Sequence, residues 1–154
     1  MQLSNLLKLN AVKVLGATTS KKRLFHDIAD LAEANFGVGS NEVVEALIER
    51  EGLGPTGVGQ GIALPHARLP GLEEVCGLFL KLEKPLEFDA VDRQPVDLVF
   101  ALLAPSNAGV EHLKALALVS RTMRDAGICA KLRANSDPAT LFTVLTDTTT
   151  TKAA

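Results

Sequence analysis

Two continuous apolar runs of strand length constrain the fold of this chain most. They extend from Val75 to Leu82 and from Val96 to Leu103, and Pro85, Pro95 and Pro105 bound them. A strand that is apolar at every position, rather than at alternate positions, is typical of a sheet whose two faces are both covered. The runs therefore predict a central sheet that is parallel or mixed.

Helix signals lie on both sides of these runs. Ser20 can cap a helix that ends at Gly37, and Ser40 can cap a second helix that ends at Gly52. Three more helices are expected towards the end of the chain: Gly109 to about Arg124, around Ile128 to Leu132, and one that follows Asp137 with Pro138 in its first turn. Together these patterns predict an α/β fold, a three-layer α-β-α sandwich with a central mixed sheet and helices on both faces.

The length and composition fit one domain. A chain of 154 residues, 47% of them hydrophobic, can bury one core but has little room for a second. We assign this domain to residues 1–147 and predict a disordered polar tail over residues 148–154.

The charge and the apolar pattern exclude several kinds of partner. The formal net charge is −2, and no cluster of Lys and Arg with interleaved aromatic residues is present, which argues against nucleic-acid binding. No apolar run is long enough for a transmembrane helix, and the first ten residues lack the features of a signal peptide. We therefore expect a cytoplasmic protein without membrane insertion, in which Cys76 and Cys129 are buried thiols.

A glycine-spaced loop precedes a short apolar segment in the sequence TGVGQGIALPHA. Gly57, Gly59 and Gly61 can adopt positive φ angles and approach a bound group closely. Successive backbone amides in such a loop can converge on an anion. The spacing therefore predicts that these glycines support a phosphate-binding loop.

The same stretch ends in a proline and a histidine. Ile62 to Leu64 is expected to be a buried strand, and Pro65 restricts the backbone so that the His66 imidazole points in a defined direction. A neutral imidazole is a competent nucleophile near neutral pH. We interpret His66 as a phosphohistidine site.

Three other residues are candidates for this site, and a fourth, His26, is expected to lie outside it. His112 lies in the first turn of a predicted helix, where free amides favour an anion and lower an imidazole pKa, so it could face a phosphoryl group on His66. Arg50 could hold phosphate oxygens, or it could simply be a favourable cation at a helix C-terminus. Glu51 is expected to hold the loop or to orient an imidazole, and His26 is expected to be a solvated helix residue.

The residues around His66 resemble the signature of a known family. Glu51, a six-residue spacer, Val58-Gly59 and the run from Gly61 to Ala67 are similar to the type-2 enzyme IIA domain of the bacterial phosphotransferase system. The segments LEFDAVDRQPVDLVFALLAP and GVEHLKALALVS extend the resemblance over nearly the whole chain. The resemblance implies a mixed sheet sandwiched by helices. It also implies that His66 accepts a phosphoryl group, with His112 and Arg50 beside it.

The implied activity is that of a phosphocarrier. Such a protein takes a phosphoryl group from a small HPr-like phosphoprotein and needs no metal or other cofactor. The stretch GLGPTGVGQGIALPHARLPGL, in a chain that ends soon after its last helix, most resembles the nitrogen-regulatory enzyme IIA, whose phosphorylation state controls regulatory target proteins. The alternative is the IIA component of a sugar transporter that passes phosphate to a IIB domain. Ile62, Leu64 and Leu69 are expected to contribute apolar contacts with partners.

Two other classes of protein fit less well. The G-x-G-x-G spacing suggests a nucleotide-binding module, but the loop precedes a strand instead of following one, and no Walker lysine is present. A histidine-metal hydrolase could use His66 and His112 as ligands, but no H-x-x-H, H-x-H or cysteine partner completes a first coordination shell.

Overall fold

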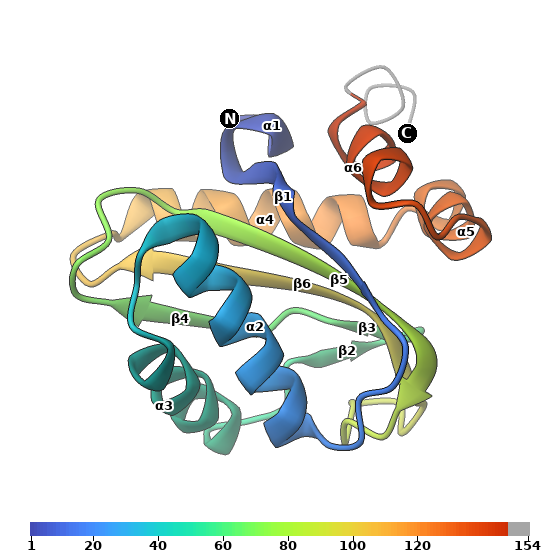
Figure 1. Ribbon diagram of the computed structural model, residues 1–154, viewed down its shortest axis with the longest axis horizontal. Coiled ribbons are helices and arrows are strands. Elements are labelled where there is room, and N and C mark those ends of the chain that lie inside the picture. Colours follow the sequence, from blue (N-terminus) through green and yellow to red (C-terminus); the bar gives the residue numbers. More distant parts are fainter. Residues whose placement is uncertain (148–154) are drawn as a thin grey trace.

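A mixed six-stranded sheet forms the centre of the molecule. The computed structural model describes residues 1–147 (Figure 1), so the predicted disordered tail over 148–154 lies outside the described residues. In chain order the elements are α1 (Leu3–Leu6), β1 (Leu7–Leu15), α2 (Lys21–Phe36), α3 (Ser40–Gly52), β2 (Gly57–Gly59), β3 (Ile62–Ala63), β4 (His66–Leu69), β5 (Cys76–Leu86), β6 (Val96–Pro105), α4 (Val110–Met123), α5 (Ala126–Ala134) and α6 (Pro138–Thr146).

The strand order is β1-β5-β6-β3-β2, with β4 also paired to β6. The β1–β5, β6–β3 and β6–β4 pairs are parallel, and the β5–β6 and β2–β3 pairs are antiparallel. Helices α2 and α3 lie on one face of the sheet and α4 lies on the other (Figure 1). This arrangement confirms the predicted α/β fold with a mixed sheet between helices.

The core explains why two strands are apolar at almost every position, with Lys81 in β5 and Asp97 in β6 as charged exceptions within the runs. All residues of β6 except Asp97 are buried, and the first seven residues of β5 are buried as well. Phe79 and Phe100 are fully buried and pack edge to face, with ring centroids 6.2 Å apart. Each face of these strands therefore packs against another layer, as the continuous apolar runs indicate.

Most of the predicted helix caps are confirmed. The Ser20 side chain accepts a hydrogen bond from the Arg23 amide, Gly37 ends α2 with a φ of 72°, and the Asp137 side chain accepts from the Thr140 amide at the start of α6. The prediction for Ser40 is wrong, because Gly39 is the N-cap of α3. The Ser40 amide instead donates to a carboxylate oxygen of Glu33 at the end of α2, 2.9 Å away.

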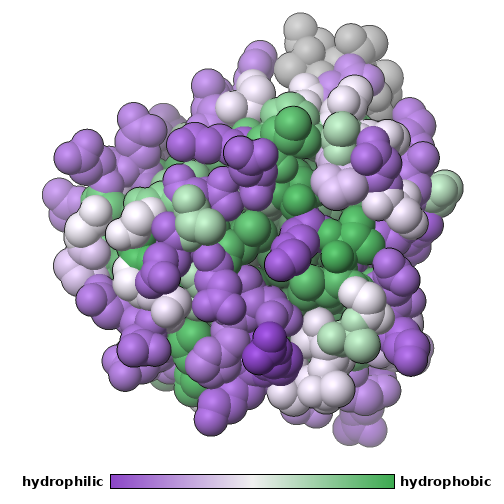
Figure 2. Space-filling model, viewed as in Figure 1, coloured by the Kyte–Doolittle hydropathy of each residue, from purple (hydrophilic) through white to green (hydrophobic). Residues whose placement is uncertain are grey.

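The surface over α2 and α3 is mainly hydrophilic. Figure 2 shows that polar side chains cover most of this face and that apolar surface gathers towards its centre.

Cys76 and Cys129 are buried and free, as expected. In the described part of the chain, no helix is both long enough and apolar enough to cross a membrane.

Candidate functional site

The backbone around His66 is fixed by its neighbour β6. Strands β3 and β4 follow one another along the same edge of β6, pairing Ile62 with Leu98 and His66 with Leu102. Pro65 lies between them, and its carbonyl accepts a hydrogen bond from the Leu102 amide at 3.0 Å. Because β6 holds the chain on both sides of Pro65, the His66 side chain leaves the sheet in a fixed direction.

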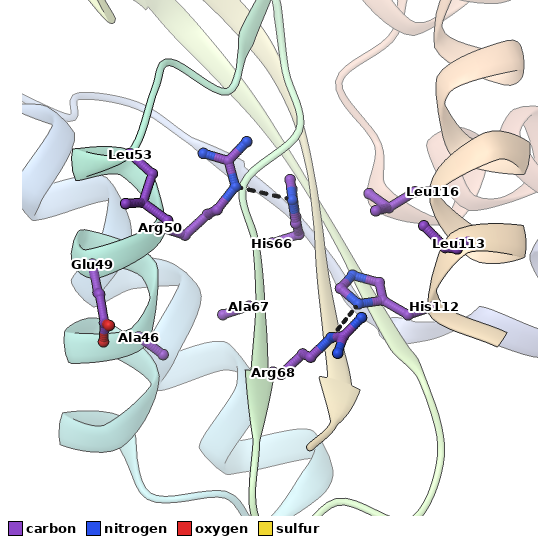
Figure 3. Close-up of a pocket in the computed structure, with 10 residues that line it drawn as sticks. All are labelled: Ala46, Glu49, Arg50, Leu53, His66, Ala67, Arg68, His112, Leu113 and Leu116. Atoms are coloured by element: carbon purple, nitrogen blue, oxygen red, sulfur yellow. Dashed lines mark hydrogen bonds between the residues drawn. The ribbon is translucent and has the colours of Figure 1, made fainter. Parts of the chain in front are cut away.

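Hydrogen bonds define which nitrogen of His66 carries the proton. Nδ1 lies 2.9 Å from the Leu64 carbonyl oxygen, which can only accept, so the proton is on Nδ1. Nε2 then keeps its lone pair, and it accepts from Nε of Arg50 at 3.2 Å (Figure 3). Arg50, in the last turn of α3, also donates from Nη1 to the Gly54 carbonyl at 2.9 Å. The resting imidazole is therefore neutral, with its lone pair on Nε2.

His112 has the opposite proton arrangement. It lies near the start of α4, and its Nδ1 accepts from Nε of Arg68 at 3.2 Å. The proton must therefore be on Nε2. This nitrogen is buried and has no hydrogen-bond partner among residues 1–147. The His66 and His112 rings lie edge to face with centroids 5.7 Å apart, and in Figure 3 Nε2 of His112 is turned towards the space between them.

Burial favours the neutral form of both imidazoles. Desolvation lowers the pKa of His66, and the charge of Arg50 lowers it further, against the opposing effects of the Leu64 carbonyl and Glu51. Desolvation likewise lowers the pKa of His112, with additional contributions from His66 and Arg68. Both shifts agree with the hydrogen bonds, since each ring accepts from an arginine and so cannot be doubly protonated.

The two histidines border one cavity between α3 and α4. It has a volume of about 530 Å³. Its lining consists of Ala46, Glu49, Arg50, Leu53, His66, Ala67, Arg68, His112, Leu113 and Leu116. Leu53 and Leu113 are unusually exposed for leucines, at 82% and 63%. An apolar rim thus surrounds a floor of two arginines and two histidines.

Glu51 holds the loop that leads to this site. Its carboxylate accepts hydrogen bonds from the amide and the hydroxyl of Thr56 and pairs with Nζ of Lys21 at 3.1 Å. The Thr56 carbonyl in turn accepts from the Leu64 amide at 2.9 Å. Of the two roles expected for Glu51, these contacts match loop support and not direct contact with an imidazole.

The three glycines lie outside the cavity lining. A Cβ on Gly57 would be 2.7 Å from that of Ala90, and one on Gly61, whose φ is 81°, would be 2.7 Å from Nη2 of Arg133. The amide of the intervening Gln60 donates to Asp92 at 2.8 Å. Gly59 has a φ of 104° and also approaches Asp92. The glycines therefore allow close packing against other segments of the protein, and the expectation that their amides hold a phosphoryl group does not fit this placement.

Sequence reasoning missed Arg68 and chose the wrong apolar residues. Arg68 is two positions after His66 in β4, so the alternation of a strand places both side chains on one face, a signal that was available once this segment is taken as extended. The residues expected to contact partners, Ile62, Leu64 and Leu69, are all buried in the core. The exposed leucines that line the cavity are instead Leu53, the C-cap of α3, and Leu113, near the start of α4. His26 is half-buried and does not line the cavity.

The fold and the histidine site together define a class of protein, the IIA components of phosphotransferase systems. The family model for the phosphoenolpyruvate-dependent sugar phosphotransferase system, EIIA 2, matches residues 5–148. The chain belongs to this family, which confirms the family predicted from the residues around His66. Among the described residues, no group of three or more His, Cys, Asp or Glu side chains is arranged to hold a metal ion.

Individual relatives are similar over almost their whole length. The nitrogen regulatory protein of Bradyrhizobium diazoefficiens is 44% identical over 145 residues, covering 94% of this chain and 95% of that protein. The nitrogen regulatory protein of Escherichia coli is 40% identical over 149 residues, covering 96% and 91%. A fructose-specific EIIA component of Haloferax volcanii is 30% identical over 146 residues, covering 94% and 95%.

Solved structures agree with this relationship. The crystal structure of the nitrogen regulatory protein IIA-Ntr from Neisseria meningitidis superposes with a TM-score of 0.86 at 36% identity, covering 94% of this chain and 99% of that one. The mannitol IIA of Escherichia coli has a TM-score of 0.74 at 19% identity and covers 90% and 97%. At that identity the mannitol protein supports the fold alone.

Proposed function

We propose that this protein is a cytoplasmic phosphocarrier of the nitrogen-regulatory kind. His66 accepts a phosphoryl group from an HPr-like phosphoprotein, and the phosphorylation state controls which target proteins bind. The higher identity to nitrogen regulatory proteins, 44% and 40% against 30% for the fructose-specific component, supports this role over sugar transport. The observation that carries the chemistry is the pair of imidazoles with opposite proton positions.

The attacking atom is Nε2 of His66. Its lone pair attacks phosphorus in line with the donor's N–P bond, so that the new N–P bond forms as the old one breaks and the bonding electrons return to the donor imidazole. The proton on Nδ1 stays in place. Its hydrogen bond to the Leu64 carbonyl, at 2.9 Å, stabilises the positive charge that the His66 ring gains.

Two hydrogen-bond donors lie next to the position that the phosphoryl oxygens will occupy. The Arg50 guanidinium lies at Nε2 of His66, and the Nε2–H of His112 is turned into the same space without a partner among residues 1–147. Donors that are oriented in advance, in a site partly shielded from water, stabilise the charge of a transferring group strongly. Arg50 and His112 therefore support the transfer, and His66 forms the bond.

Partners dock on the apolar rim around the cavity. Leu53 and Leu113 are exposed on the two sides of His66. A phosphoryl group adds about −1.5 to −2 charges for an oxygen ester and a comparable dianion on histidine. Because this charge appears between the apolar side chains, a target that binds the unphosphorylated surface through apolar contacts loses affinity after phosphorylation.

Transfer from a labelled donor tests this function. Purified phosphorylated HPr-like protein is mixed with the wild type, and the label is followed onto His66 and then onto any acceptor. Pull-downs compare phosphorylated wild type, unphosphorylated wild type and His66→Ala. Partner sets that differ between the two states of the wild type support the regulatory role. Identical partner sets together with rapid transfer to a sugar-specific IIB domain would establish the transport alternative instead.

A further inference from the structure

Arg68 lines the cavity, and its side chain donates a hydrogen bond to another residue of the site. Its Nε donates to Nδ1 of His112 at 3.2 Å, and no hydrogen bond joins it to His66 (Figure 3). Arg68 is exposed, so this contact is not forced by burial of its charge. By contrast, Nε2 of His112 is completely buried and lacks a partner among residues 1–147.

The hydrogen bond from Arg68 dictates how His112 can act. A nitrogen that accepts a hydrogen bond cannot carry a proton, so the single proton of the neutral ring must be on Nε2. In the other tautomer, Nε2 would present a lone pair to the phosphoryl oxygens. A lone pair there would repel these oxygens instead of donating to them.

We infer that Arg68 is a positioning residue that fixes the His112 ring with its Nε2–H directed at the phosphoryl group on His66. This inference rests on the proposed function, but it concerns a separate step. Arg50 and His112 address the transferring group, whereas Arg68 sets the tautomer and the orientation of His112. The strand alternation of β4 makes this possible, because His66 and Arg68 emerge on one face and His112 reaches them from α4.

Two substitutions separate the effect of the hydrogen-bond donor of Arg68 from the effect of its charge. In glutamine, the side-chain nitrogen stands at the same position along the chain as Nε of arginine, so Arg68→Gln removes the charge and keeps a donor for Nδ1 of His112. In methionine, a methyl group stands at that position, so Arg68→Met keeps a stem of similar length and removes both. Arg124→Met is the matched control, since Arg124 is exposed and, among residues 1–147, its side chain bonds only to its own helix at the Ser120 carbonyl.

Two readouts are needed. The first is the ¹⁵N chemical shifts of His112 in the unphosphorylated protein, which report the protonation of each ring nitrogen. The second is the rate at which His66 accepts a phosphoryl group from the labelled donor. We expect Arg68→Gln to keep the wild-type His112 shifts and a rate within about 3-fold of wild type, and Arg68→Met to change the Nδ1 shift and slow acceptance by about 10-fold or more.

The outcomes are distinct. Wild-type His112 shifts in Arg68→Met would overturn the inference, because the ring would then be held by something other than Arg68. The inference would also be overturned if Arg68→Gln and Arg68→Met accepted phosphate equally slowly while the His112 shifts stayed unchanged. That result would mean that Arg68 acts through its charge. If the wild type failed to accept phosphate at all, the proposed function would fail, while the His112 shifts would still decide whether Arg68 sets the tautomer. Unchanged melting temperatures confirm that the variants are folded.

Discussion

The imidazoles of His66 and His112 lie edge to face at a centroid distance of 5.7 Å, and each accepts a hydrogen bond from the Nε of a different arginine. The nitrogens that accept are not equivalent. His66 accepts at Nε2 and keeps its proton on Nδ1, whereas His112 accepts at Nδ1 and keeps its proton on Nε2. One ring therefore offers a lone pair and the other offers a donor, which is the division of roles that phosphoryl transfer to a histidine requires.

Removal of the His66 nucleophile should abolish phosphoryl acceptance. We expect His66→Ala to take up no label from the donor and to keep the melting temperature of the wild type within a few degrees, because His66 is only partly buried. His26→Ala, at a half-buried position of α2 outside the cavity lining, should accept label normally. The wild-type adduct should be acid-labile, and ¹⁵N NMR should place the phosphorus on Nε2. An acid-stable adduct, or one on Nδ1, contradicts the assignment.

Replacement of Arg50 should slow transfer without abolishing it. Arg50→Met removes the guanidinium that donates to Nε2 of His66, and we expect a rate reduced by a factor of about 10 to 1,000. Arg50→Lys should recover part of the rate, since it restores the charge but not the forked geometry. Arg23→Met, which removes an exposed charge from α2, serves as the control. A wild-type rate in Arg50→Met would exclude Arg50 from the site.

His112 should support the reaction without carrying the label. In His112→Gln we expect transfer to be slower by a factor of about 10 to 1,000, with His66 still the only labelled residue after long incubation. Peptide mapping of the adduct checks this point. Label on a peptide containing position 112 in the wild type would show that His112 is the acceptor, and after complete loss of labelling in His112→Gln the same peptide map decides between the two histidines.

Both histidines of the site should titrate below the ordinary range. Because desolvation lowers the pKa of His66 and His112, their NMR titration midpoints in the folded protein should lie below the value of about 6.5 found for unfolded chains. Arg50→Gln should raise the His66 midpoint, since it removes a nearby positive charge. A His66 midpoint at or above 6.5 in the wild type contradicts this account of the site.

The same shifts predict how stability depends on pH. Between the lowered folded pKa values and the unfolded value of about 6.5, the unfolded chain binds more protons than the folded one, so the free energy of unfolding rises with pH in this window. Above this pH window the two histidines make their full contribution to the free energy of unfolding. That contribution is lost as the pH falls through the window. Denaturant titrations at pH 7.5 and at successively lower pH should show this decline, and His66→Ala should reduce it.

Gly57 should matter for folding and not for chemistry. A methyl group at this position would meet Ala90 at 2.7 Å, so we expect Gly57→Ala to lower the free energy of unfolding by about 1 to 3 kcal/mol. Gly16→Ala, where nothing lies within 4 Å of the added carbon, is the control. At a temperature where both variants are folded, phosphoryl acceptance should stay close to wild type. If Gly57→Ala accepted phosphoryl groups much more slowly at unchanged stability, Gly57 would be part of the phosphate site.

The fold could be predicted because its signals are local. The Ser20 and Asp137 caps, the Gly37 helix end and the unbroken apolar runs of β5 and β6 each depend on a few neighbouring residues. His66 was found because it lies in a short recognisable pattern that Arg50 directly precedes, and His112 was found from its place in the first turn of a predicted helix. The structure brings all three to one cavity.

The remaining features depend on contacts between distant segments. Whether a glycine faces a ligand or another segment of the protein is decided by Ala90 and Arg133, far along the chain from Gly57 and Gly61. Leu64 looks like a flanking contact in the sequence, yet the sheet buries it, while Leu53 is exposed because α3 ends there. No local pattern distinguishes these two leucines.

The hydrogen bond between Arg50 and His66 has a consequence for how the protein reports its own state. The Nε2 lone pair of His66 can accept the hydrogen bond from Arg50 or bond to phosphorus, but not both. Phosphorylation therefore breaks this hydrogen bond, and the guanidinium donates to phosphoryl oxygens instead. Arg50 also donates to the Gly54 carbonyl, next to the most exposed leucine of the rim. A change of partner at Arg50 therefore alters the turn at residues 53–54, and a protein that contacts only this turn could distinguish the phosphorylated carrier from the unphosphorylated one.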